Sequence, residues 1–187
     1  MRVVGGRLGG RTLVAPKSQA IRPTADRLRE ALFNILTHAY GDPVDGARVL
    51  DLFAGTGALG IEALSRGAAF ALFIDDGAEA RALLRENVTA LGLGGTSRIF
   101  RRDATKLGPV HPLEPFTLAF LDPPYGQGLA EKALTSARGG GWFAPDALIV
   151  VEEATKANFI APEGFAETER RRYDDTEFIF LRTVSGA

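Results

Sequence analysis

Four consecutive residues, Asp122-Pro123-Pro124-Tyr125, carry the clearest chemical signal in the sequence. They follow the apolar run 117–121, which we expect to be a buried strand, and two prolines would end that strand and fix the backbone beyond it. The Asp122 carboxylate and the Pro123 carbonyl would then offer two acceptors, enough for both hydrogens of an NH2 group. Tyr125 supplies a flat face on which a splayed-out base can stack. The motif therefore predicts chemistry on an exocyclic amino group.

A glycine-rich segment joins the apolar run Val49–Phe53 to a predicted helix over residues 59–66. Glycines let the backbone turn sharply and approach a ligand closely, and open α/β sheets bind nucleotides at such a turn. Asp51 lies inside the motif, where a phosphate would gain nothing from its negative charge. We expect it to pair with the ammonium of a cationic amino-acid ligand, such as the methionyl part of S-adenosylmethionine. The cofactor contacts predicted here are Asp51, Phe53, Ala54, Gly55, Thr56, Gly57 and Gly60.

Acidic residues also follow the next two predicted strands. Asp75 ends the run Phe70–Ile74, where a carboxylate can accept both hydroxyls of a ribose; Asp76 beside it competes for the same role. Asp103 follows the weaker strand candidate 98–101 and, with Ala104, is placed to contact an adenine.

The elements that position these residues alternate between strand and helix. Near-continuous apolar strands separated by helices predict a parallel sheet covered on both faces. Residues 165–172 and 177–183 have no helix between them, which predicts an antiparallel hairpin at one edge of the sheet. The further elements that we expect are helices over 78–91 and 129–137 and a strand over 147–151.

The N-terminal segment differs in pattern and in charge. Residues 1–16 alternate short β-prone pieces with glycine pairs, which predicts a hairpin or a loosely ordered arm. Pro23 and Thr24 then begin an amphipathic helix that runs to about Ala39, with Thr24 as its N-cap. We therefore expect a basic arm over residues 1–22 and a single globular domain over residues 23–187.

The net charge of −1 conceals an asymmetry, because residues 1–30 hold seven basic side chains against Asp26 and Glu30. A basic arm on an acidic body indicates an anionic polymer as partner. The alternative is a terminal extension whose charges are simply solvated. The phosphate contacts that we predict are Arg7, Arg11, Arg22 and Arg27.

Composition excludes several classes of protein. With no cysteine and two histidines, disulfides and thiolate metal sites are excluded and a histidine-rich metal site is not expected. No apolar run has the length of a signal peptide or a membrane span. We expect a cytoplasmic monomer with no membrane partner and no metal.

Together these motifs resemble those of class I amino-methyltransferases, whose (Asn or Asp)-Pro-Pro-aromatic signature occupies the end of the fourth strand. The segment Arg22–Leu36, with Val4-Gly5-Gly6 and Gly9-Gly10-Arg11 before it, resembles the bacterial 16S ribosomal RNA guanine-N2 methyltransferase family. The resemblance covers essentially the whole chain. It implies a Rossmann-like, seven-stranded, mostly parallel sheet with an antiparallel C-terminal hairpin and an N-terminal β-hairpin arm.

The resemblance also implies roles for the residues. S-adenosylmethionine, with S-adenosylhomocysteine as product, would contact the Asp51–Gly60 loop, Asp75 and Asp103, while Asp122 and Tyr125 would serve the target base. The substrate implied is the N2 of a guanine in the head of the small ribosomal subunit. We expect 16S ribosomal RNA in a partly assembled subunit as the partner.

Three alternatives stay open. The same amine chemistry serves adenine N6 in DNA or RNA, or a protein glutamine, although the segment 22–36 and the small size favour ribosomal RNA. From another class, an NAD-linked oxidoreductase would share the fold, but Asp51 and the Asp122–Tyr125 motif argue against it. A non-catalytic RNA-binding protein that kept the fold is the third.

Overall fold

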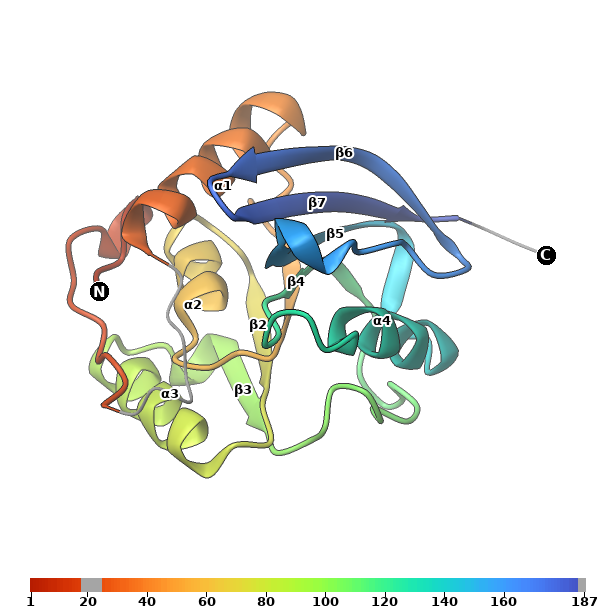
Figure 1. Ribbon diagram of the computed structural model, residues 1–187. Coiled ribbons are helices and arrows are strands. Elements are labelled where there is room, and N and C mark those ends of the chain that lie inside the picture. The colour runs from red at the N-terminus through yellow and green to blue at the C-terminus, as the bar shows by residue number, and fades with distance from the viewer. Residues whose placement is uncertain (18–24, 185–187) are drawn as a thin grey trace.

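A seven-stranded sheet forms the centre of the protein, which is described here by a computed structural model covering residues 1–17 and 25–184 (Figure 1). The strand order is β3-β2-β1-β4-β5-β7-β6; neighbouring strands from β3 to β5 are parallel, and β7 is antiparallel to both β5 and β6. This confirms the predicted Rossmann-like sheet with its C-terminal hairpin. The strands are β1 Arg48–Leu52, β2 Phe70–Ile74, β3 Ser97–Phe100, β4 Phe116–Leu121, β5 Phe143–Ala154, β6 Phe165–Tyr173 and β7 Thr176–Thr183.

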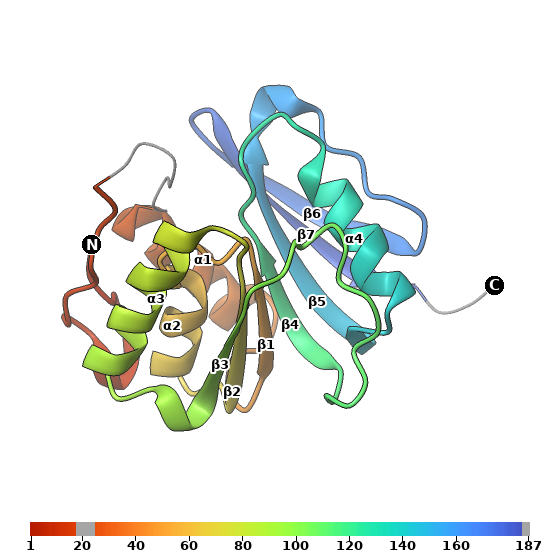
Figure 2. The ribbon, with the colours of Figure 1, turned by 90° about the horizontal axis from the view of Figure 1, so that it is seen from below.

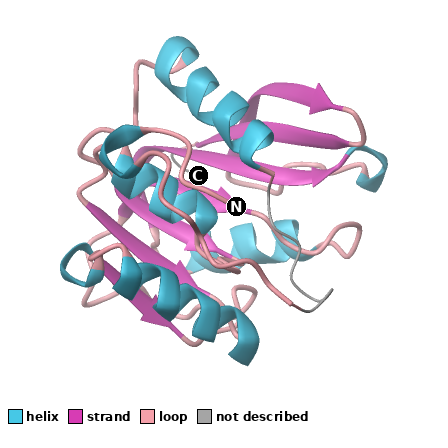
Figure 3. Cartoon of the chain, turned by 90° about the vertical axis from the view of Figure 1, so that its left-hand side faces the viewer, coloured by secondary structure: helices cyan, strands magenta, loops and turns pink. Residues whose placement is uncertain are grey.

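Helices cover both faces of the sheet, as Figures 2 and 3 show. On one face lie α1 (Asp26–Ala39), α2 (Ala58–Ser65) and α3 (Ala78–Ala90), and on the other lies α4 (Leu129–Gly139). Successive strand residues point to opposite faces, so Val49 packs with the three-helix layer and Leu50 with the layer of α4. No helix in residues 1–17 or 25–184 is long and apolar enough to span a bilayer.

Strand β5 begins earlier than predicted, at Phe143 instead of Ala147. Its pairing with β4 shifts between Phe116↔Phe143 and Leu118↔Leu148, and Asp146 within this interval has φ 61°. Such a bulge accommodates Pro145, which cannot donate to a regular ladder. The proline therefore marks an irregularity inside the strand and not its start.

Helix α1 begins at Asp26, with Ala25 in the N-cap position and no side-chain cap. The predicted cap, Thr24, is thus one residue too early; Thr24, Pro23 and Arg22 all lie outside the described residues. The helix ends at Ala39 as predicted, because its apolar stripe ends there.

The first residues of the chain pair with themselves and pack on the body. Arg2 and Thr12 form an antiparallel bridge, closed by a 3-10 turn over Gly6–Leu8. Val3, Leu8 and Leu13 are buried in the same core cluster as the apolar residues of α1 and α2. The sequence predicted a hairpin or a loosely ordered arm; the Arg2–Thr12 bridge agrees with the hairpin, and residues 1–14 lie against α2 and α3.

Candidate active site

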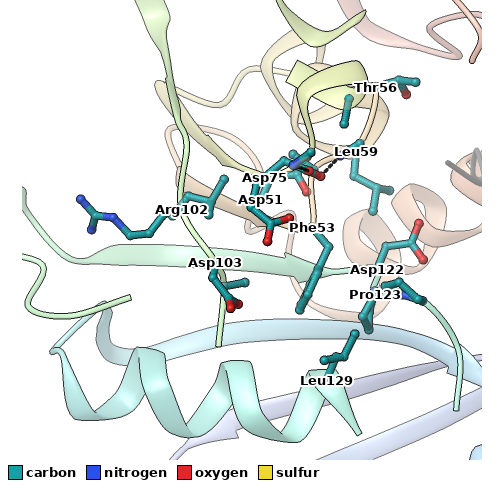
Figure 4. A pocket seen from close by; sticks show the side chains of 18 of the residues that line it. Asp51, Phe53, Thr56, Leu59, Asp75, Arg102, Asp103, Asp122, Pro123 and Leu129 are labelled. Atoms are coloured by element: carbon teal, nitrogen blue, oxygen red, sulfur yellow. Dashed lines mark hydrogen bonds between the residues drawn. The ribbon is translucent and has the colours of Figure 1, made fainter. Parts of the chain in front are cut away.

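A pocket of about 720 Å³ opens at the carboxyl ends of the parallel strands, where the loops after β1, β2, β3 and β4 meet (Figure 4). Parallel strands present their carboxyl ends at one edge of the sheet, which is where α/β proteins bind ligands. The predicted site residues that line the pocket are Asp51, Phe53, Ala54, Gly55, Thr56, Asp75, Asp76, Asp103, Ala104, Asp122, Pro123, Pro124 and Tyr125.

Asp51 is a buried carboxylate in the pocket wall, with a relative exposure of 1%. Its Oδ2 accepts the N–H of Gly60 at 2.9 Å, and within the described residues it forms no ion pair. Burial raises the pKa of Asp51 well above its usual range; the Gly60 N–H opposes this rise and the negative charge of Asp75 adds to it. A cation entering the pocket would favour the ionised form of Asp51.

Gly57 and Gly60, also predicted to contact the cofactor, are not among the lining residues. A Cβ on Gly57, which has φ +84°, would lie 2.3 Å from Leu84 Cδ1, and one on Gly60 would lie 2.4 Å from Phe73 Cε1. These glycines allow α2 to pack closely against its neighbours, and Gly60 also holds Asp51 in place.

Asp75 is tied to the glycine loop by hydrogen bonds to both carboxylate oxygens. Its Oδ2 accepts the N–H of Gly55 at 2.9 Å and its Oδ1 accepts the N–H of Gly77 at 2.8 Å. Asp76 also lines the pocket but is exposed. Of the two candidates for the ribose, Asp75 is therefore the one whose orientation is set by the loop.

Asp103 follows β3 and borders the opposite part of the pocket (Figure 4). Its Oδ1 accepts both the N–H of Thr105 at 2.8 Å and the Thr105 hydroxyl at 2.7 Å. These two hydrogen bonds hold the pKa of Asp103 below its usual range. The carboxylate is therefore kept ionised, in a turn that directs it at the pocket.

The Asp122–Tyr125 loop closes the pocket on the side of β4 and β5. Asp122 is half-buried directly after Leu121, whose partner in β5 is Val151. The Tyr125 hydroxyl donates to Glu152 Oε2 at 2.9 Å, and the Gly126 N–H donates to Glu153 Oε1 at 3.1 Å. Two buried glutamates that the sequence analysis did not single out thus hold this loop; their only sequence signal was their place at the end of an apolar run.

Arg102 is a lining residue that the sequence analysis also missed, although it precedes Asp103. Its guanidinium lies over the rings of Phe100 and Trp142 and donates to the carbonyl of Leu107. Across residues 1–17 and 25–184, no group of three or more His, Asp or Glu side chains is arranged to hold a metal ion.

The basic residues predicted to contact RNA fall in different places. Arg7 lies between Gly6 and Leu8, which both pack on Ser65 at the end of α2, about 10 Å along the helix from the pocket-lining Ala58. Arg11 donates to the carbonyl of Ala90, at the end of α3 away from the pocket.

Arg27 lies on the pocket side. Its guanidinium is 4.0 Å from the Asp174 carboxylate and its side chain is 85% exposed. Asp174 is two residues before Thr176, whose hydroxyl contacts Tyr125. Arg22, the fourth predicted contact, lies outside the described residues.

This sheet order defines the fold of a class I methyltransferase. At the carboxyl ends of its strands lie a glycine-loop acid, further acids at the next strand ends and an Asp-Pro-Pro-Tyr loop on β4. The family model described as "Conserved hypothetical protein 95" matches residues 1–182, and the chain belongs to this family.

Named relatives agree with this assignment. The chain is 40% identical over 153 residues, 81% of its length, to "Ribosomal RNA small subunit methyltransferase D" of Escherichia coli K12, covering 74% of that protein. It is 33% identical over 167 residues to the Haemophilus influenzae protein of the same name, covering 88% of this chain and 84% of that one. A solved structure titled "Putative methyltransferase yhhF from Escherichia coli" superimposes with a TM-score of 0.83 and 31% identity, over 100% of this chain and 99% of that one.

Proposed function

We propose that the protein is an S-adenosylmethionine-dependent methyltransferase that methylates the N2 of a guanine in small-subunit ribosomal RNA. The observation that carries this proposal is that one pocket brings the Asp122–Tyr125 loop together with Asp51 and Asp75. The names of the E. coli and H. influenzae relatives support ribosomal RNA as the substrate.

The pocket residues fit S-adenosylmethionine. The buried Asp51 carboxylate has no cationic partner in the described part of the chain, and a methionyl ammonium would supply one. Asp75 would hold the ribose hydroxyls and Asp103 the adenine amino group. When bound, the cofactor supplies an electrophilic methyl group and leaves as S-adenosylhomocysteine.

The chain's own contribution to the reaction is to orient the amine. The Asp122 carboxylate and the Pro123 carbonyl each accept one hydrogen of the exocyclic NH2, which discourages delocalisation of the nitrogen lone pair into the ring. Tyr125 stacks on the base and keeps it out of its helix. Holding the reactants in one geometry lowers the barrier without any covalent step on the enzyme.

The test is methylation of purified small-subunit ribosomal RNA, naked and within assembling particles, by the isolated chain. Mass spectrometry of the digested nucleosides should show N2-methylguanosine in the wild-type reaction. N6-methyladenosine would favour the adenine alternative, and a product on protein would favour the glutamine alternative. Calorimetry with S-adenosylhomocysteine and with NAD separates the methyltransferase from the oxidoreductase.

Asp122→Ala is the matching variant. It should fold and bind S-adenosylhomocysteine as the wild type does, yet lose about 10²-fold or more in methyl transfer, because it removes an oriented acceptor of the amine. Turnover near the wild-type rate would remove Asp122 from this role. Asp75→Ala should show the reverse pattern and weaken cofactor binding first.

A further inference from the structure

The hydroxyl of Tyr125 is held by two neighbouring strands. It donates a hydrogen bond to Glu152 Oε2 at 2.9 Å, and Thr176 Oγ1 lies 3.0 Å from it. A phenol has one hydrogen, so with that hydrogen directed at Glu152 the Thr176 hydroxyl donates to the phenol oxygen. Glu152, near the end of β5, is 2% exposed, and Thr176 is the first residue of β7.

These contacts restrain a ring whose backbone is already restrained. Pro123 and Pro124 fix the chain before Tyr125, and the Gly126 N–H bonded to Glu153 fixes it afterwards. The hydroxyl contacts fix the far end of the side chain. The ring, which lines the pocket, is therefore held at both ends.

We propose that Glu152 and Thr176 are positioning residues, which hold the Tyr125 ring where the target base stacks. This inference rests on the proposed function, since it needs a base as substrate. It also gives the antiparallel hairpin a part in the site, because β7 supplies Thr176. Misplacing a bound group by about 1 Å can lower a rate by up to about 10²-fold.

The first test measures single-turnover methyl transfer to small-subunit ribosomal RNA. Tyr125→Phe keeps the ring and removes the anchored hydroxyl, and Glu152→Leu removes the acceptor; each should lower the rate constant about tenfold. The double variant should also lose only about tenfold, because both changes break the same hydrogen bond. Glu152→Gln keeps an acceptor oxygen and should recover most of the rate that Glu152→Leu loses. Affinity for S-adenosylhomocysteine should stay unchanged in all of them.

The chain offers a matched control at Tyr40. Its hydroxyl donates to Glu169 Oε1 at 2.8 Å and lies 3.0 Å from Thr168 Oγ1, and Tyr40 is not among the pocket-lining residues. Tyr40→Phe removes a hydroxyl from equivalent partners and should leave the rate unchanged. A wild-type rate in Tyr125→Phe, or multiplied losses in the double variant, would overturn the proposal.

The second test needs no substrate and separates this inference from the proposed function. The chain has 3 tyrosines, so 3-fluorotyrosine labelling yields a readily assigned fluorine NMR spectrum. Glu152→Leu should shift or broaden the Tyr125 signal and leave the Tyr40 signal in place. If the Tyr125 signal does not move in Glu152→Leu, the anchoring is refuted. If the signal shifts but the wild-type protein transfers no methyl group to RNA, the anchoring stands and only the proposed function is refuted.

Discussion

Replacing Gly60 by alanine tests whether this glycine serves packing or the ligand. Within a helix, alanine is ordinarily more stable than glycine by about 0.5–1 kcal/mol. Here the new Cβ would lie 2.4 Å from Phe73 Cε1 and 3.0 Å from Asp51 Oδ2, whereas carbon atoms in contact lie roughly 3.5–4.0 Å apart. Phe73 is fully buried, so it has little room to move. Overpacking costs about 1–3 kcal/mol, and a contact this short with a fully buried ring belongs to the upper part of that range, about 2–3 kcal/mol. Subtracting about 1 kcal/mol for the better helix propensity of alanine leaves a net loss of about 1–2 kcal/mol.

Thermal unfolding without ligand is the assay. In a chain of this size, 1 kcal/mol shifts the midpoint by about 2–4 °C, so Gly60→Ala should unfold roughly 2–8 °C lower. Gly139→Ala is the control: this glycine ends α4 and its Cβ would meet nothing within 4 Å. That midpoint should be unchanged or slightly higher. An unchanged or raised midpoint in Gly60→Ala would refute the packing argument. Lost cofactor affinity with unchanged stability would support the sequence-based prediction that Gly60 contacts the cofactor.

Three further predictions follow from the site. Asp51→Asn should have a larger free energy of unfolding than the unliganded wild type, because ionising the buried carboxyl destabilises the folded chain. The difference should grow as the pH rises from the ordinary pKa of Asp, near 3.8, through the raised pKa of Asp51. Denaturant titrations at several pH values would show the opposite pH dependence if Asp51 were a stabilising anion. Arg27→Ala should raise the RNA dissociation constant and lower the slope of its log–log salt dependence by about 0.7–0.9, while Arg7→Ala should change both less. Salt titrations that rank the two variants the other way would contradict an RNA contact at Arg27. Asn87→Asp should weaken the binding of S-adenosylhomocysteine, because Asn87 Nδ2 donates to the carbonyl of the pocket-lining Thr56 at 3.0 Å and aspartate cannot replace this donor. Leaving a buried carbonyl unpaired costs about 1–3 kcal/mol. Unchanged affinity by calorimetry would contradict this prediction.

The pocket could be anticipated from the sequence because its acids lie at or near the ends of apolar runs. Asp51, Asp75, Asp103 and Asp122 are far apart in the chain, yet parallel strands bring their carboxyl ends to one edge. The closing hairpin could be anticipated as well, since two strand patterns with no helix between them must be antiparallel neighbours. The first residue of β5 could not be predicted, because a proline is compatible both with the start of a strand and with a bulge inside it, as Pro145 is in β5.

The sequence by itself determined the alternation of strands and helices, the mostly parallel sheet that this alternation implies, and the residue types at the strand ends, because these depend on local periodicity and on the restricted backbone of proline and glycine. The order of the strands came from the structure. Only the tertiary structure decided the roles of residues that depend on contacts between distant parts of the chain. Gly57 and Gly60 are packing glycines because Leu84 and Phe73 lie against them.

The N-terminal segment illustrates the same division. Its charge could be counted from the sequence, but its position follows from Glu62, a buried carboxylate that accepts the N–H groups of Val4 and Gly5 at 2.9 Å each. A buried carboxylate needs partners, and Glu62 takes these two N–H groups in addition to its ion pair with Arg66. The body therefore binds this segment through its backbone as well as through the buried side chains of Val3, Leu8 and Leu13. The anchoring of Tyr125 by Glu152 likewise joins residues 27 positions apart, a pairing that no local pattern specifies and that the register of neighbouring strands creates.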